Sequence, residues 1–154
     1  MNPIDIAAWS GNWAWGLPLI VLNTVFHVCG LALISETLVH RLSGSFGRPG
    51  FMSQFAIAMS VIALLVAVLH GIEGIIWAVA YRLLGALADN RSAMLYSLSA
   101  ITSFGHANLF LKPHWQLMGA LEALNGMLLF GLTTAFLFAM IQVLWPLGSR
   151  KGRD

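Results

Sequence analysis

Two ionisable side chains, His70 and Glu73, lie within a long apolar run and are the first candidates for chemistry. Because they are three residues apart, they lie on one face of a helix and can hydrogen-bond to each other. An ionisable residue inside an apolar span is a functional candidate, since burying it is costly. The pair either anchors this run to a neighbouring short helix near Tyr96 or contributes to a metal site, for which two ligands are a weak signal. His27, in an earlier apolar run, is expected to hydrogen-bond between helices.

Further polar and small residues lie in the last apolar run. Glu122 and Asn125 occupy its first turns, and three roles fit Glu122: steadying the backbone of a neighbouring helix, contacting ions, or remaining a buried protonated carboxyl. Gly126 and Gly131 either form a gating hinge, because glycine weakens a helix, or allow close packing between helices. Two hydroxyl residues follow that either line a cavity or bond to their own helix: Thr133 and Thr134.

The elements that position these residues are three apolar runs at about 17–38, 55–81 and 117–145. Hydrophobic residues make up 58% of the 154 residues and charged residues 9%, against about 25% in soluble domains. Each run is long enough to cross a bilayer, which needs ~20 mostly apolar residues. We therefore expect an all-α membrane protein with a single domain over residues 1–154 and lipid as its solvent. A net charge of +2 is too small to indicate nucleic-acid binding.

Between the second and third runs, residues 92–101 are predicted to form a short amphipathic helix. Asp89, Asn90 or Ser92 is suited to cap it. The next residues, 102–109, have no helical period, and Lys112-Pro113 prevents the helix from continuing. A short helix and an irregular stretch between two spans is the layout of a re-entrant loop, which needs burial in protein or contact with water.

Basic residues predict the orientation of the chain in the membrane. Arg41 and Arg48 follow the first run, and basic residues also follow the last, so both segments are expected in the cytoplasm. The N-terminal segment has no Lys or Arg and contains three tryptophans, which suits the outer interface. The basic residues of the last segment are Arg150, Lys151 and Arg153, and the tryptophans are Trp9, Trp13 and Trp15.

The order of span, short helix, Thr-containing stretch and span resembles the pore module of tetrameric potassium-type channels, and it is closest to small bacterial channel-like proteins with one extra helix before the pore. The family's filter reads Thr-Thr-x-Gly-Tyr-Gly-Asp. The aligned residues here are Thr102, Ser103, Phe104, Gly105, His106, Ala107 and Asn108. The resemblance implies a pore helix at 92–101, a filter at 102–108, a homotetramer and a monovalent cation, K⁺ or Na⁺, as the permeant ligand.

The departures from this filter have physical consequences. Carbonyl rings replace the hydration shell of the ion, and Gly105 supplies the positive φ that such a backbone needs. Ala107 would resist a left-handed conformation by roughly 1 kcal/mol or more. Four His106 imidazoles would form a pH-sensitive ring, bind or be blocked by a transition metal, or pack behind the filter. Asn108 in place of an acid either weakens cation steering or serves the turn, and Thr102 would offer oxygens at the inner end of the filter.

We therefore expect a potassium-channel-like pore in a bacterial inner membrane, with the N-terminus outside, the C-terminus in the cytoplasm and weak or altered cation selectivity. One alternative is a nonconducting structural or sensor protein derived from a channel. Another is a proton- or metal-linked pathway through His106, with His70 and Glu73 as further candidates. The sequence has no catalytic constellation and no cofactor motif, so an enzyme is not expected.

Overall fold

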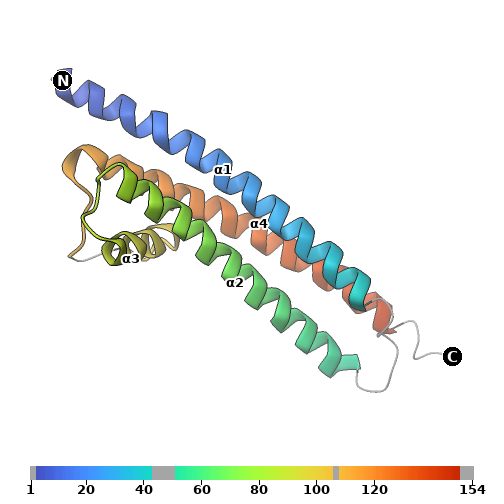
Figure 1. Ribbon diagram of the computed structural model, residues 1–154. Coiled ribbons are helices and arrows are strands. Elements are labelled where there is room, and N and C mark those ends of the chain that lie inside the picture. Colours follow the sequence, from blue (N-terminus) through green and yellow to red (C-terminus); the bar gives the residue numbers. More distant parts are fainter. Residues whose placement is uncertain (1–2, 43–50, 106–107, 150–154) are drawn as a thin grey trace. The chain divides into compact units, whose positions relative to one another are not determined.

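The protein is described by a computed structural model that covers residues 3–42, 51–105 and 108–149. The elements are α1 (Pro3–Leu42), α2 (Phe51–Leu83), α3 (Asn90–Ile101), a short 3-10 turn (Pro113–Trp115) and α4 (Gln116–Ser149). Figure 1 shows the short α3 between the long α2 and α4 in chain order. The described residues form helices, turns and loops without a β-strand.

Among the described residues, three helices are long and apolar enough to cross a membrane: Trp9–Leu38, Met52–Leu83 and Pro113–Trp145. The three predicted apolar helices are confirmed in number and order, and they extend beyond the predicted limits. The largest extension is at the start of α1, which continues through Pro18 to Pro3. Pro18 has no backbone N–H and so removes one hydrogen bond from α1, and the helix continues past it.

The chain divides into two compact units, and each is described separately. Unit 2 contains 28–69 and 131–154 and has an apolar core of α1, α2 and α4 side chains, including Leu31, Ile62 and Leu144. Within it, the rings of Phe55 and Trp145 meet edge to face at 5.3 Å. Unit 1 contains 1–27 and 70–130, and it holds the candidate site residues up to Gly126.

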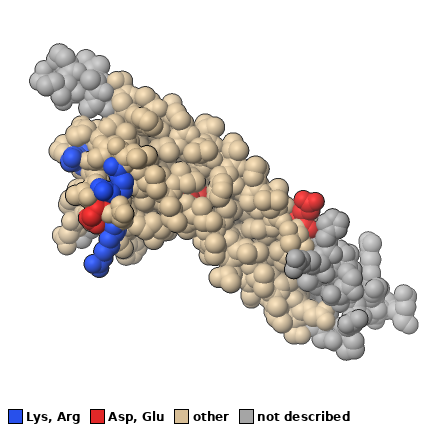
Figure 2. All heavy atoms as spheres, viewed as in Figure 1, with Lys and Arg blue, Asp and Glu red and all other residues tan. Residues whose placement is uncertain are grey.

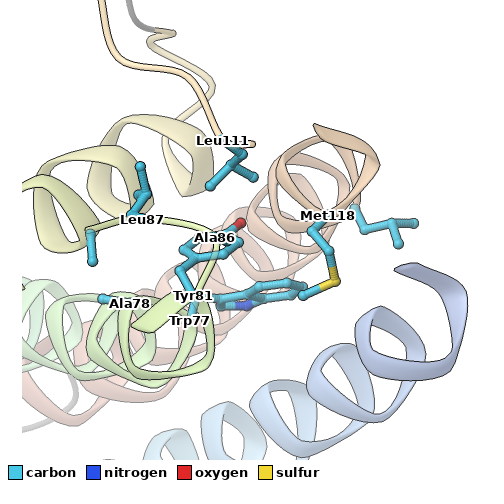
Figure 3. Close-up of a cluster of buried hydrophobic side chains, with 9 residues drawn as sticks. Trp77, Ala78, Tyr81, Ala86, Leu87, Leu111 and Met118 are labelled. Carbon is cyan, nitrogen blue, oxygen red and sulfur yellow. The ribbon is translucent and has the colours of Figure 1, made fainter. Parts of the chain in front are cut away.

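The core of unit 1 forms where α2, the loop after it and the start of α4 meet. Figure 3 shows Trp77 and Tyr81 of α2 close to Ala86, Leu111 and Met118. These five side chains are nearly or fully buried. Close van der Waals packing among these side chains holds the loops on both sides of α3 against the long helices.

Helices α2 and α3 end with the same motif. After α2, the Ala86 N–H donates to Tyr81 O and the Gly85 N–H to Arg82 O, with Gly85 at φ +63°. After α3, the Phe104 N–H donates to Ser99 O and the Ser103 N–H to Ala100 O, with Ser103 at φ +56°. Both are Schellman motifs, which satisfy the last helical carbonyls through one left-handed residue.

The start of α3 is capped by Asp89, one of the three predicted caps. Its carboxylate accepts the Ser92 N–H at 2.9 Å. Hydrogen bonds from the Ser92 backbone hold the pKa of Asp89 below its ordinary value. Arg82 links the end of α2 to the start of α3, because its side chain donates to Asn90 Oδ1 and to Leu87 O, each at 2.8 Å.

Three contacts define the path of residues 84–112 within unit 1. Ser97 of α3 donates to Gly74 O of α2 at 2.7 Å. The Ile101 carbonyl lies against Gly126 of α4, which is about 15 Å along the axis from Gln116 at 1.5 Å per residue. The Lys112 N–H then donates to Ala86 O at 3.3 Å. The segment therefore runs along α2 and α4 and returns to the end of α2 from which it began.

Candidate functional site

Glu122 lies at the centre of a buried network that joins three helices. Its Oε2 accepts the Tyr81 hydroxyl of α2 at 2.5 Å, and its Oε1 lies 2.5 Å from Ser97 Oγ of α3. All three side chains are fully buried. Buried polar groups need such partners, because an unsatisfied one costs about 1–3 kcal/mol. Of the predicted roles of Glu122, the network supports steadying the short helix.

Gly126 has the close-packing role of the two that were predicted for it. A Cβ at this position would collide with the Ile101 backbone carbonyl at the end of α3. Gly131, in unit 2, differs because a Cβ there would meet nothing within 4 Å. Thr133 is buried and Thr134 is exposed, and both make contacts, so the cavity-lining role stays a prediction for them.

The first two predicted filter residues, Thr102 and Ser103, form the end of α3. The Thr102 hydroxyl donates to Leu98 O at 2.7 Å, and its backbone is helical, with φ −85° and ψ −2°. Ser103 is the left-handed residue of the cap, and Gly105 has φ +79°, the positive value expected of it. Phe104 is 87% exposed. Thr102 and Ser103 thus form the cap of α3, because the last carbonyls of α3 find their donors locally.

Two predicted filter residues, His106 and Ala107, lie outside the described residues, so the expectations for the histidine ring and the outer carbonyl stay predictions. Asn108 is described and exposed. Beside this stretch, a surface hollow is lined by α3, the loop and α4, including Ser99, Phe110 and Ala123. Phe110 is 68% exposed. Side chains of this size on the surface indicate a face that another molecule or lipid covers.

A second buried cluster connects α1 to α2 in unit 1. His27 Nδ1 lies 2.7 Å from Glu73 Oε1, and His70 Nδ1 lies 2.9 Å from Glu73 Oε2, at ion-pair distance. His27 and Glu73 are fully buried, and the His70 side chain is 12% exposed. The imidazole of His70 stacks on Phe130 at 4.5 Å. The expected interhelical hydrogen bond of His27 is confirmed, and Glu73 is its partner.

The His70–Glu73 pair was predicted to anchor α2 to the short helix, but other residues hold that helix in the structure. The pair contacts His27 of α1, while Ser97 and Glu122 hold α3. The spacing of three between His70 and Glu73 was readable from the sequence. The contribution of His27 was not, because it lies 46 residues from Glu73.

Two buried amide side chains, one on α1 and one on α4, were not predicted to lack hydrogen-bond partners. Both side-chain polar atoms of Asn23 on α1 and of Asn125 on α4 are buried without a hydrogen-bond partner among the described residues. Asn23 precedes His27 by four residues and so lies on the same face of α1. The i, i+4 spacing of Asn23 and His27 was the signal available in the sequence. Buried amides of this kind ordinarily bind ordered water.

Charge in unit 1 gathers around the short helix. Figure 2 shows the Lys and Arg side chains of unit 1 together near α3. They are Arg82, Arg91 and Lys112, and the Asp89 carboxylate lies close to Arg82. The residues that predict orientation, Arg48, Arg150, Lys151 and Arg153, lie outside the described residues. Comparison with known proteins finds no matching family model, no matching curated protein and no matching solved structure.

Proposed function

We propose that the protein is a homotetrameric, potassium-channel-like pore that passes monovalent cations, K⁺ or Na⁺, across a bacterial inner membrane with weak or altered selectivity. The observation that carries the proposal is the path of residues 84–112. The segment leaves the end of α2, reaches Gly126 through Ile101 and returns to Ala86 through Lys112. A loop that enters and leaves a membrane on the same side follows such a path, and α3 is then its pore helix.

The supporting network around α3 fits this role. A pore helix must hold its carboxyl end in place, because that end carries a partial negative charge that favours a cation. Hydrogen bonds among Glu122, Ser97 and Tyr81 fix the middle of α3 to both long helices. The last carbonyl of α3, that of Ile101, packs against Gly126. In the proposed tetramer, four carboxyl ends would face one central cavity.

Assembly must also complete the filter. A carbonyl ring needs residues from several chains, so a single chain has no partners for an extended filter strand. In the single chain, Thr102 and Ser103 instead satisfy the end of α3. The proposal therefore requires this cap to open when four chains meet, and the positive φ of Gly105 suits the opened strand.

The same cap favours a second candidate function. If Thr102 and Ser103 keep their capping bonds in the assembled protein, the filter carbonyls stay turned away from the axis and no ion passes. The protein would then be a nonconducting structural or sensor membrane protein with a channel-derived scaffold.

Cation flux into proteoliposomes separates the two functions. Purified protein would be compared with protein-free liposomes for potassium, sodium and a large organic cation. Two variants add the same negative charge three residues apart: Gly105→Asp strains a left-handed position in the filter, and Asn108→Asp restores the acid of the outer mouth. The pore predicts flux that Gly105→Asp abolishes and Asn108→Asp increases.

Each result has a defined meaning. Potassium-favoured flux would show that the inner filter positions suffice for selectivity, and equal potassium and sodium flux would show a weakly selective pore. No flux under any gradient or pH, from protein that is tetrameric and helical, would exclude the pore and favour the nonconducting scaffold. Flux that Gly105→Asp leaves unchanged would place the ion path elsewhere.

A further inference from the structure

We propose that His27, His70 and Glu73 form a binding site for one divalent transition-metal ion of the zinc class. The three side chains come from two helices of unit 1 and can each offer one ligand atom, and these atoms all lie within 4.8 Å of one another. Two imidazoles and one carboxylate are a set that protein zinc sites use, with a water at the fourth position.

The distances within the cluster fit a metal-free site that an ion can enter with little movement. Tetrahedral zinc, with bonds of about 2.0–2.2 Å, places its ligand atoms roughly 3.3–3.6 Å apart. The two Nδ1 atoms lie 2.7 and 2.9 Å from the Glu73 oxygens. To bind the ion, these two contacts must lengthen by roughly 0.4–0.9 Å, and ligand atoms that lie farther apart, within the 4.8 Å limit of the cluster, must close to the same spacing.

Without a metal, protons bridge the contacts between the histidine nitrogens and Glu73. A carboxylate only accepts hydrogen bonds, so an Nδ1 that bonds to Glu73 carries a proton. Metal binding requires unprotonated nitrogen, and a proton that bridges a ligand nitrogen and Glu73 leaves to water when the ion enters. The carboxylate then contributes its negative charge to the ion, which partly offsets the cost of a cation among buried side chains.

The surroundings orient the ligands and leave room for a fourth one. His27 and Glu73 are fully buried, and Phe130 stacks on the His70 ring, so the side chains have little freedom to turn away. Of the three side chains, only that of His70 reaches the surface of the chain, at 12% exposed. The Asn23 amide, four residues before His27 on the same face of α1, has two unsatisfied polar atoms that suit a metal-bound water.

The Glu122 network is a weaker candidate for the same ion. Its donors are the carboxylate of Glu122 and the hydroxyls of Tyr81 and Ser97, which already bond to one another. Zinc-class ions prefer nitrogen and sulfur donors, and imidazole is the donor that only the His27 cluster supplies among these two sites. The site we propose would tie α1 to α2 and stabilise the folded protein by mass action.

The test uses the full-length protein in detergent, freed of any histidine tag and stripped with a chelator. The protein is equilibrated with Zn²⁺, desalted and assayed for zinc per chain. Co²⁺ serves as a second probe, because its visible absorption reports a tetrahedral site. We expect about one ion per chain, an intense tetrahedral Co²⁺ spectrum and a higher Tm with zinc than without it.

Variants locate the site. His27→Gln and Glu73→Gln are expected to weaken zinc binding by at least about tenfold and to remove the tetrahedral Co²⁺ spectrum. His114→Gln changes an exposed histidine outside the cluster and is the matched control. His106→Gln tests the filter histidine, and both controls are expected to keep the ion.

The proposal is overturned if the native chain retains no zinc and gives no tetrahedral Co²⁺ spectrum. It is also overturned if folded His27→Gln or Glu73→Gln protein binds as tightly as the native chain. Circular dichroism and size-exclusion chromatography identify variants that fail to fold, and His70→Gln, at the partly exposed position, replaces any that do. Ion flux is not part of the readout, so the outcome is independent of the proposed pore.

Discussion

Ser103, one of the predicted filter residues, carries a backbone strain. Among the described residues it is the one non-glycine residue with positive φ, at +56°. Its backbone closes α3 through the Ser103 N–H to Ala100 O bond. A left-handed conformation costs an L-residue roughly 1–2 kcal/mol, and glycine does not have this cost. The native serine therefore holds the cap less firmly than glycine would.

Ser103→Gly is expected to stabilise the cap by about 1 kcal/mol. A firmer cap also resists opening, so in the proposed pore this variant should lower cation flux while raising Tm. Thermal unfolding in detergent and flux in proteoliposomes measure the two effects. Ser103→Ala, which retains the left-handed strain, is the control, and equal Tm values for the two variants would contradict this account.

Glu122→Ala is expected to destabilise the protein by about 1–3 kcal/mol. The change leaves the Tyr81 hydroxyl buried without its acceptor, while the Ser97 hydroxyl keeps Gly74 O as its acceptor. Glu36→Ala, at an exposed glutamate, should change stability by less than about 0.5 kcal/mol. Unfolding by denaturant or heat in detergent measures both, and similar losses in the two variants would show that the network is not stabilising.

At the scale of elements, α3 is held at both of its ends by local chemistry and in its middle by tertiary contacts. Asp89 caps the start, the Ser103 motif closes the end, and Ser97 bonds to both long helices. Two glycines of α4 allow the close approach of α3: a Cβ at Gly126 would collide with the Ile101 carbonyl, and a Cβ at Gly119 would collide with the Tyr96 hydroxyl. The depth that α3 reaches along α4 therefore depends on these two positions.

Gly126→Ala is expected to push α3 away from α4, because its Cβ meets a backbone carbonyl that cannot turn aside. A loss of about 1–3 kcal/mol follows, as in other overpacked sites. Gly131→Ala is the matched control in the same helix, and it should be neutral or slightly stabilising, since its Cβ is unobstructed and alanine favours the helix. The Tm values of both variants are compared by thermal unfolding. A lower Tm for Gly131→Ala together with an unchanged or higher Tm for Gly126→Ala would refute the packing role.

The cap at Asp89 makes the start of α3 sensitive to acid. The pKa of Asp89 is lowered from 3.8, so its capping contribution is complete above that pH and is lost as the pH falls through the folded-state value. Asp89→Asn keeps a capping oxygen without the charge. Between pH 6 and pH 3, Tm should fall further for the native chain than for the variant. An equal fall in Tm for the two proteins over this pH range would contradict the role of the Asp89 carboxylate as the cap.

At the scale of the whole molecule, the spans leave most of their surface available to lipid or to other copies of the chain. The buried share of their most apolar windows is 17%, 22% and 22%, so few of those side chains pack within the chain itself. Around α3, Phe104 and Phe110 are both largely exposed. Four chains around an axis beside this loop would cover these side chains.

Cross-linking tests this assembly. In a Cys29→Ser background, which removes the exposed native thiol, Phe110→Cys should give products up to a tetramer with a short bis-maleimide in membranes. Val21→Cys places an exposed thiol on α1 of the same unit and should give mainly monomer if that face meets lipid. Products that stop at a dimer for Phe110→Cys would exclude the proposed fourfold arrangement.

Much of the helical structure could be predicted from local properties. Apolar runs of sufficient length marked the three long helices, and the possible caps Asp89, Asn90 and Ser92 marked the start of α3 to within two residues. These features depend on neighbours within a few residues, for which helical periodicity and capping are sufficient rules. The positive φ of Gly105 was predictable for the same reason, because glycine tolerates it.

The partners of the buried polar residues were decided by the tertiary structure alone. Periodicity places His27, Glu73 and Glu122 on faces of their helices, but it does not say which helix lies opposite each face. The pairing of His27 with Glu73 and of Tyr81 with Glu122 spans more than forty residues. The choice between a hinge and a close-packing role for Gly126 likewise depended on the position of Ile101. Such contacts follow from how helices pack in space, and local sequence does not contain that information.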